Sequence, residues 1–196
     1  MGVTINDLFA GAVIAAYTKL DLPEERKPSQ YLCYLAASTA TEKIIDDQFQ
    51  PGNEATVVSP VFERNTDLTQ ASLNVKEVMA PFKGRHDLFE AQWRLLNVLK
   101  KVFSNANLFK YGFKDTVMKT NFVVSNMTSS MRAPWILKGN KVHWISLVGA
   151  NTNVPSISLV SLHDSVRVAT LSDTGVLPET QLLLQGIEQE FKQALN

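Results

Sequence analysis

The sequence predicts an α+β domain in which a largely antiparallel or mixed sheet is flanked by helices. Stretches with apolar residues at helical spacing occupy the beginning, the middle and the end of the chain. Short apolar runs typical of strands separate them and fill most of the last third. Two of these late runs are joined by only two residues, which predicts a tight antiparallel hairpin.

The first helix is predicted over Thr4 to Leu20, because its apolar residues follow the i, i+3, i+4 spacing of one helix face. Further apolar residues widen this stripe almost around the helix, so we expect it to be buried on most sides. Thr4 or Asn6 can cap its start, and Asp7 suits the positive end of the helix dipole.

The middle of the chain is predicted to combine strands with amphipathic helices. Strands are expected over Tyr31 to Ala37 and over Thr56 to Phe62, the second one either broken at Pro60 or at the edge of the sheet, because proline cannot donate to a sheet ladder. Helices are expected over Asp67 to Met79 and over Asp87 to Phe103, each with apolar residues on one face.

The last third is predicted to be mostly β. Strands are expected over Asn121 to Asn126, Val142 to Val148, Ser156 to Leu162 and Ser165 to Leu171. The final hairpin is apolar on both faces, so we expect both sides of the sheet to be covered. Pro178 is expected to start the closing helix. No repeat or linker divides the chain, which predicts a single domain over residues 1–196.

Composition and charge narrow the class of protein. Nineteen basic residues balance nineteen acidic ones, which argues against nucleic acid as a partner. No run of about eighteen apolar residues occurs, so no transmembrane segment is expected. The single cysteine, Cys33, cannot form an internal disulfide, and no secretory signal precedes it. We therefore expect an intracellular, reducing compartment, with cytoplasm and organelles both open.

No motif in the sequence identifies a catalytic centre. His86, His143 and His163 lack metal-binding spacing, and one cysteine cannot build a zinc site, so neither a metal nor a resident cofactor is expected. His163 and Asp164 are adjacent in a predicted turn and should face solvent. No nucleophile elbow, phosphate loop or dinucleotide fingerprint occurs, and no general base can be identified.

Several segments nevertheless carry a family resemblance when they are taken in order. Thr4-Ile5-Asn6-Asp7 opens an alanine-rich helix, Val123-Val124-Ser125-Asn126 ends a strand, and the late hairpin, Asp173 and the closing helix follow. In this order the segments resemble the C-terminal half of the wax ester synthase/diacylglycerol acyltransferases. The resemblance implies a chloramphenicol acetyltransferase-like fold, in which two similar halves enclose an acyl tunnel, and this chain would be one half.

The resemblance also identifies what this chain lacks. The family's His-His-x-x-x-Asp-Gly motif, whose second histidine acts as general base on the acceptor hydroxyl, belongs to the other half, and no His-His pair occurs here. Met127-Thr128-Ser129-Ser130 replaces the turn that usually follows Ser-Asn. No catalytic residue is therefore expected in this chain.

The resemblance further implies that Asn6, Asp7, Ser125 and Asn126 lie near the boundary between the halves. Their residue types alone also fit helix capping by Asn6 and Asp7, which is the favoured interpretation of those two, and strand-end hydrogen bonding by Ser125 and Asn126. Both interpretations stay open at this point.

Three functions are compatible with this pattern. The first is a non-catalytic, acyltransferase-derived subunit, or pseudoenzyme, that serves as an interaction protein of a larger assembly. The second is the C-terminal half of an O-acyltransferase of lipid metabolism, which would move acyl groups from acyl-CoA to a fatty alcohol or diacylglycerol. It would be active only with a chain that supplies the His-His motif, and acyl-CoA would be its substrate. The third, a free-standing small-molecule binding module, needs a closed pocket that half a tunnel does not give.

The first two functions require a partner. We expect another protein chain, or a second copy, to cover the missing half and to bury at least about 1,000 Å². The first helix is apolar almost all the way round, and the late hairpin is apolar on both faces. Both features favour a partner that covers apolar surface. Met1 lies immediately before the Asn-Asp helix, which favours a genuine short protein over a random fragment, while a native short protein and a processed fragment both stay open.

Overall fold

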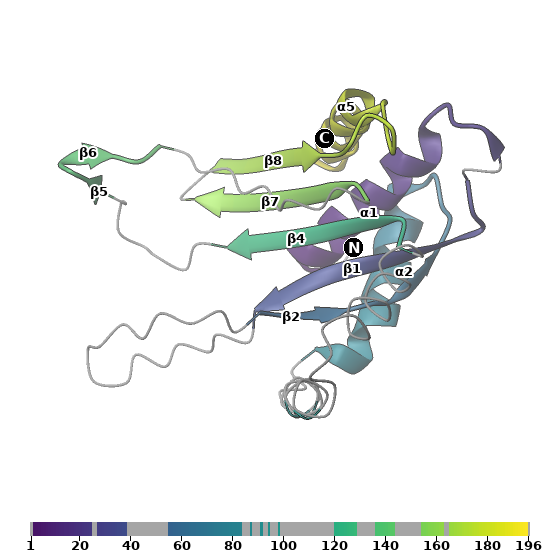
Figure 1. Ribbon diagram of the computed structural model, residues 1–196, viewed down its shortest axis with the longest axis horizontal. Helices are drawn as coiled ribbons and strands as arrows, with labels where there is room; N and C mark the ends of the chain where they lie inside the picture. The colour runs from purple at the N-terminus through teal and green to yellow at the C-terminus, as the bar shows by residue number, and fades with distance from the viewer. Residues whose placement is uncertain are drawn as a thin grey trace.

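The computed structural model describes residues 2–24, 27–38, 55–83, 120–128, 136–143, 154–162 and 165–195, and the single helical positions 87, 91, 94 and 98. These ranges form a mixed sheet with helices packed against one face (Figure 1). In chain order the elements are α1 (Ile5–Lys19), β1 (Gln30–Ser38), β2 (Ala55–Val58), β3 (Val61–Glu63), α2 (Leu68–Met79), the short 3-10 helix η2 (Ala80–Phe82), β4 (Phe122–Thr128), β5 (Ile136–Leu137), β6 (Asn140–Lys141), β7 (Ser156–Leu162), β8 (Ser165–Leu171) and α5 (Thr180–Leu195).

The sheet contains parallel and antiparallel pairs, which confirms the predicted α+β class with a mixed sheet. Its strand order is β2–β1–β4–β7–β8, and β3 pairs with the first residues of β1. β1, β4 and β7 are mutually parallel, whereas β2, β3 and β8 are antiparallel to their neighbours. The three parallel strands therefore end on the same side of the sheet, which is named the carboxyl edge here.

Most predicted strand positions are confirmed. Pro60 divides the expected strand over residues 56–62 into β2 and β3, as a missing amide donor requires. β7 and β8 pair antiparallel along their whole length, from Ser156↔Leu171 to Leu162↔Ser165. On the face of β7 turned away from the helices, Ser156 and Ser158 are buried, so both sides of this strand are covered.

The strand expected from Val142 is wrong at its beginning. Val142 and His143 have no regular structure, and residues 144–148 lie outside the described ranges. Lys138 and Gly139 have φ values of 49° and 80°, which fold the chain into a tight turn. This turn pairs β6 back onto β5 in a separate two-stranded sheet, so the strand in this segment ends before Val142.

The predicted start of the closing helix is wrong, and most of the helix predicted over residues 87–103 lies outside the described residues. The closing helix begins at Thr180 rather than at Pro178, because Pro178 and Glu179 form a turn and the Thr180 hydroxyl donates to the Leu177 carbonyl over 2.6 Å. Of the helix predicted over residues 87–103, only positions 87, 91, 94 and 98 are described, all of them helical and exposed.

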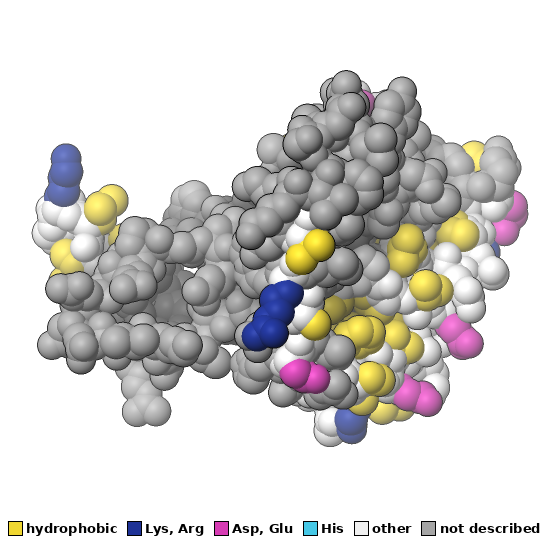
Figure 2. Space-filling model, turned by 60° about the horizontal axis from the view of Figure 1, so that its bottom comes forward, with side chains coloured by type: hydrophobic (Ala, Val, Ile, Leu, Met, Phe, Trp, Pro, Cys, Tyr) yellow, Lys and Arg dark blue, Asp and Glu magenta, His cyan; other side chains and the backbone are white. Residues whose placement is uncertain are grey.

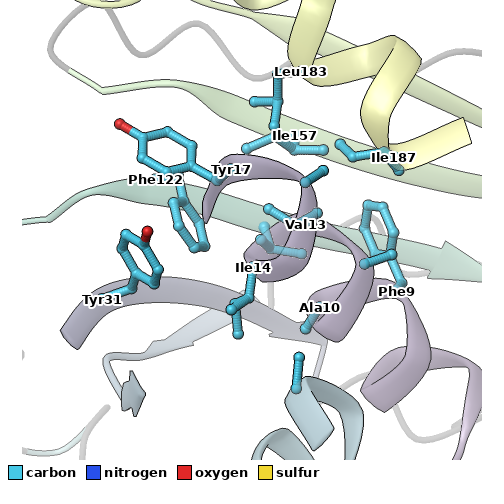
Figure 3. Packing of buried hydrophobic residues seen from close by; sticks show 14 of the residues in the cluster. Phe9, Ala10, Val13, Ile14, Tyr17, Tyr31, Phe122, Ile157, Leu183 and Ile187 are labelled. Carbon is cyan, nitrogen blue, oxygen red and sulfur yellow. The ribbon is translucent and has the colours of Figure 1, made fainter. Parts of the chain in front are cut away.

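The core forms around α1, which lies against the sheet between α2 and α5 (Figures 1 and 3). Side chains from α1, from the sheet and from α5 converge in Figure 3, and most of them have no exposed surface. Burying one such side chain is worth about 1.5–3 kcal/mol. The labelled members are Phe9, Ala10, Val13, Ile14, Tyr17, Tyr31, Phe122, Ile157, Leu183 and Ile187.

The burial of α1 confirms the prediction that it is covered on most sides, but the cover comes from its own chain. Residues 9–17 are all buried beneath the sheet, α2 and α5. The apolar surface around this helix is therefore covered without a partner chain. It does not support the expectation that a partner is needed. A salt bridge from Lys19 of α1 to the buried Glu190 also joins α5 to α1.

An aromatic cluster closes the end of the core opposite the carboxyl edge. The rings of Tyr17, Tyr31 and Phe122 lie with centroids 5.4–5.6 Å apart. The Thr18 hydroxyl donates to the Ile14 carbonyl, so the Tyr31 hydroxyl donates to Thr18 over 3.1 Å. Burial raises the pKa of Tyr31, which keeps the phenol neutral and the hydrogen bond intact.

Contact between α1 and α2 depends on Gly11. A Cβ atom at this position would lie 2.4 Å from Ser72 Oγ and 2.8 Å from the Ser72 backbone. Ser72 is fully buried, so neither helix has room to yield. The absence of a side chain at position 11 therefore sets the distance between the two helices.

We expect Gly11→Ala to destabilise the protein by about 1–3 kcal/mol through overpacking, even though alanine favours a helix by about 1 kcal/mol. Urea unfolding followed by circular dichroism measures this. Gly186→Ala in α5 is the matched control, because its Cβ would meet a single methyl group at 3.1 Å. Equal stabilities of the two variants would contradict the close α1–α2 approach.

Candidate functional site

The first turn of α1 meets the end of β4 at the carboxyl edge. In β4 the side chains of Phe122 and Val124 are buried under α1, and Asn126 follows on the same face because strand residues alternate. Asn126 donates its side-chain amide to Asn6 Oδ1, so two residues 120 positions apart in the sequence are in contact. Asn6 is exposed and Asn126 is half-buried, which leaves the pair accessible from one side.

Asn6 is held in position by the capping box of α1. The Thr4 hydroxyl accepts from the Asp7 amide over 3.3 Å, and Asp7 Oδ2 accepts from the Thr4 amide over 2.9 Å. The same carboxylate oxygen accepts from the Thr4 hydroxyl over 2.8 Å. These reciprocal bonds satisfy donors that a helix start leaves unpaired, and they fix the turn that presents Asn6.

Asp7 is also the buried partner of an ion pair. Lys83, just after η2, places its ammonium 2.7 Å and 2.8 Å from the two carboxylate oxygens. Burial alone would raise the pKa of Asp7, but the hydrogen bonds from Lys83 and Thr4 and the lysine charge outweigh it, and its pKa lies below the usual value. Asp7 is therefore ionised at neutral pH.

This cluster can orient a polar group but is poorly suited to remove a proton. Both oxygens of Asp7 are occupied by Lys83 and Thr4, and a side-chain amide is not a base at neutral pH. Asn126 Oδ1 is buried and accepts no hydrogen bond from the described residues, so it can receive one from a donor. The carboxyl ends of parallel strands are a common location for ligands.

Ser125 does not join the cluster. It is half-buried and points to the opposite face of β4, where it lies beside Ala36 of β1 and Ser158 of β7 in the sheet register. Of the four positions that the resemblance implied, the structure thus brings Asn6 and Asn126 into contact, places Asp7 in the same turn of α1 with Thr4 and Lys83 as partners, and separates Ser125 from them.

The other candidate residues give no second site. His143 is exposed beside the β5–β6 hairpin, while His86, His163, Asp164 and the Cys33 side chain lie outside the described residues. Across the described ranges no group of three His, Cys, Asp or Glu side chains could hold a metal. No helix in this part of the chain is both long and apolar enough to cross a membrane.

Lys83, the ion-pair partner of Asp7, was not predicted from the sequence. It lies 76 positions from Asp7, and nothing around it distinguishes it from any lysine after a helix. Only the packing of α2 against α1 and the short turn of η2 bring its ammonium to Asp7.

The comparisons with known proteins identify the family. Residues 52–194, more than half of the chain, match the WS/DGAT C-terminal domain. The chain belongs to this family. Among solved structures it is similar to a wax ester synthase/diacylglycerol acyltransferase from Marinobacter aquaeolei VT8, with a TM-score of 0.60 and 17% identity. No curated protein sequence matches.

The extent of these matches matters for the site. The WS/DGAT C-terminal domain match begins after β1, so Asn6 and Asp7 precede it, whereas Ser125 and Asn126 fall within it. The structural match covers 96% of this chain and 42% of the Marinobacter chain. The chain therefore spans less than half the length of that protein, and the fold likeness confirms the expected half of a chloramphenicol acetyltransferase-like architecture.

We expect Asp7→Asn to lower the free energy of unfolding by about 1–3 kcal/mol at pH 7, because the Lys83 bonds lose their charged acceptor. The folded pKa of Asp7 is lowered, so its stabilisation is present above the unfolded value of about 3.9 and is lost as pH falls through the folded pKa. Urea titrations of both proteins from pH 7 to pH 3 measure the difference.

The control is Asp67→Asn, at the exposed N-cap of α2, where asparagine caps about as well as aspartate. Its effect should stay within about 0.5 kcal/mol. A stability difference between wild type and Asp7→Asn that stays constant down to pH 3 would show that the Asp7 carboxylate does not carry the effect.

Proposed function

We propose that this chain is the non-catalytic half of an acyltransferase-type assembly and does not transfer acyl groups by itself. The observation that supports this is the chemistry of the Asn6–Asn126 cluster at the carboxyl edge. It offers amides that orient a substrate, but its one carboxylate is ionised and occupied by Lys83 and Thr4.

Family membership supports the acyltransferase origin of the domain, and the 42% share of the Marinobacter chain supports a missing half. The absent His-His motif is consistent with both: acyl transfer to a hydroxyl needs a group that accepts its proton, and loss of such a group costs about 10²–10⁴ in rate. No cofactor enters this proposal, and acyl-CoA would be a substrate only under the second candidate function described next.

A second candidate function is the C-terminal half of an active O-acyltransferase, completed by a chain with the His-His motif. The exposed side of Asn6 favours it, because it leaves hydrogen-bonding capacity at the carboxyl edge, and the Asn126 amide that donates to it is in place beside it. A hydroxyl or carbonyl of the acceptor or acyl group fits such a pair of amides. The two functions differ only in whether the complete assembly turns over.

The purified chain should transfer no acyl group from acyl-CoA to a fatty alcohol or to diacylglycerol. Release of free CoA thiol and thin-layer analysis of radiolabelled lipid measure this. Robust turnover that His143→Ala or His163→Ala abolishes would overturn the proposal and indicate a separate active site.

Mixing the chain with the half that carries the His-His motif distinguishes the two candidates. Turnover of the mixture supports the O-acyltransferase function, and a stable but inactive complex supports the non-catalytic one. In an active mixture, Asn126→Ala should lower kcat/KM about tenfold to a hundredfold, as loss of a positioned hydrogen bond does. Asn74→Ala, whose side chain only accepts from the Glu63 amide on β3, is the control and should leave kcat/KM unchanged.

A further inference from the structure

The β5–β6 hairpin, residues 136–141, forms an arm at the carboxyl-edge end of the molecule and lies apart from the other elements (Figure 1). Ile136 and Leu137 are 66% and 69% exposed, more than any other large apolar side chain among the described residues. A Cβ on Gly139 at its tip would meet nothing within 4 Å. A two-stranded hairpin of this size is marginal in water, so a binding partner would stabilise it.

Arrangement of side chains on the arm indicates a protein partner rather than a lipid surface. Ile136 lies opposite Lys141 and Leu137 opposite Asn140, while Lys138 and Gly139 form the tip. Entry into a bilayer tip-first would bury the Lys138 charge deepest, which is costly. A protein surface with apolar side chains and carboxylates would accommodate the stem and pair with both lysines.

Such a surface is present on this chain itself, over β3 and α2. Val61 and Leu73 are 46% and 38% exposed, and Glu63 and Glu77 are exposed beside them in the same two elements. The Glu63 amide donates to Asn74 Oδ1 over 3.2 Å, which fixes β3 against α2. Figure 2, in which the bottom of Figure 1 comes forward, shows hydrophobic side chains with both acidic and basic side chains around them.

Lys76 of α2 lies near this surface, but its ammonium donates to the Gly2 carbonyl over 2.9 Å and so points away from Glu63 and Glu77. The surface of Val61, Glu63, Leu73 and Glu77, the acidic face, therefore complements the face of the arm on which Ile136 and Lys141 lie, with Lys138 at the tip.

The arm and the acidic face lie at opposite ends of the same sheet. β3 pairs with the first residues of β1, while the arm lies beyond the carboxyl edge, at the far end of β1 (Figure 1). β1 has nine residues, so its two ends are about 30 Å apart. An arm cannot reach the acidic face of its own chain from there, and the contact requires a second molecule.

We infer that two copies of this chain pair side by side in opposite directions, each arm docked on the other's acidic face. A two-fold axis across the strand direction brings both arms to both faces at once, which gives two identical contacts and a closed dimer. This pairing requires neither acyl transfer nor a catalytic half, so it goes beyond the proposed function and can fail independently of it.

Sedimentation velocity of the full chain tests the pairing. Wild-type protein should dimerise at micromolar concentration, and Ile136→Ser with Leu137→Ser should weaken dimerisation at least about tenfold. Leu182→Ser on α5, 56% exposed and outside both surfaces, is the matched control and should dimerise like wild type. A wild-type chain that stays monomeric up to about 100 μM overturns the inference.

Charge exchange identifies the two surfaces. Lys138→Glu with Lys141→Glu should abolish self-association, and so should Glu63→Lys with Glu77→Lys, because each places like charges together. An equimolar mixture should form a mixed dimer within about threefold of wild-type affinity, since both contacts are then complementary. A mixture that stays monomeric contradicts the assignment of the surfaces.

Binding to a lipid surface is the competing outcome. Flotation with vesicles of equal parts phosphatidylserine and phosphatidylcholine should leave the wild-type chain unbound. If the chain floats with these vesicles, and Ile136→Ser with Leu137→Ser releases it, the arm is a membrane contact and the dimer is wrong.

Discussion

Burial of α1 between the sheet and the two helices beside it is the constraint on which the other parts of this structure depend. Its middle residues are covered on every side, so the sheet, α2 and α5 must each contribute an apolar surface to it. Gly11 allows α2 to approach the helix backbone, and Lys19 joins the helix end to Glu190 of α5. A helix this deeply buried leaves little freedom in the direction of its first turn.

That direction determines the geometry of the candidate site. The aromatic cluster of Tyr17, Tyr31 and Phe122 holds one end of α1 at the starts of β1 and β4. The helix runs back along the sheet, so its N-terminus reaches the carboxyl edge beside Asn126. Thr4 and Lys83 occupy both carboxylate oxygens of the buried Asp7. Of Asn6 and Asp7, Asn6 is therefore the accessible residue. The position of α1 on the sheet thus determines both the packing of the core and the contact between Asn6 and Asn126.

The charges of the cluster also set the limits of its chemistry. A buried carboxylate with two lysine hydrogen bonds and a capping threonine is stabilised in its ionised form. Such a group supports structure and orients its neighbours, but it has no remaining affinity for a substrate proton. The carboxylate of this site therefore serves the structure of the first turn of α1.

The sequence by itself determined most of the described elements, because local periodicity or local turn chemistry encodes them, whereas the β5–β6 hairpin and the first residue of α5 were not predicted. The helical spacing of residues 4–20, the break at Pro60 and the two-residue connection of the late hairpin all gave correct positions. The resemblance drawn from short motifs gave the family and the half-fold. The resemblance implies that Asn6 and Asn126 lie near the boundary between the halves, but a local pattern cannot show that their side chains meet.

Only the tertiary structure decided which residues share a site and which surfaces remain open. Strand alternation places Ser125 on the other face from Asn126, although the two are adjacent in the sequence. Lys83 reaches Asp7 only because α2 packs on α1. The girth of α1 suggested a partner, yet its own chain covers it, because burial depends on all neighbours in space rather than on the helix alone.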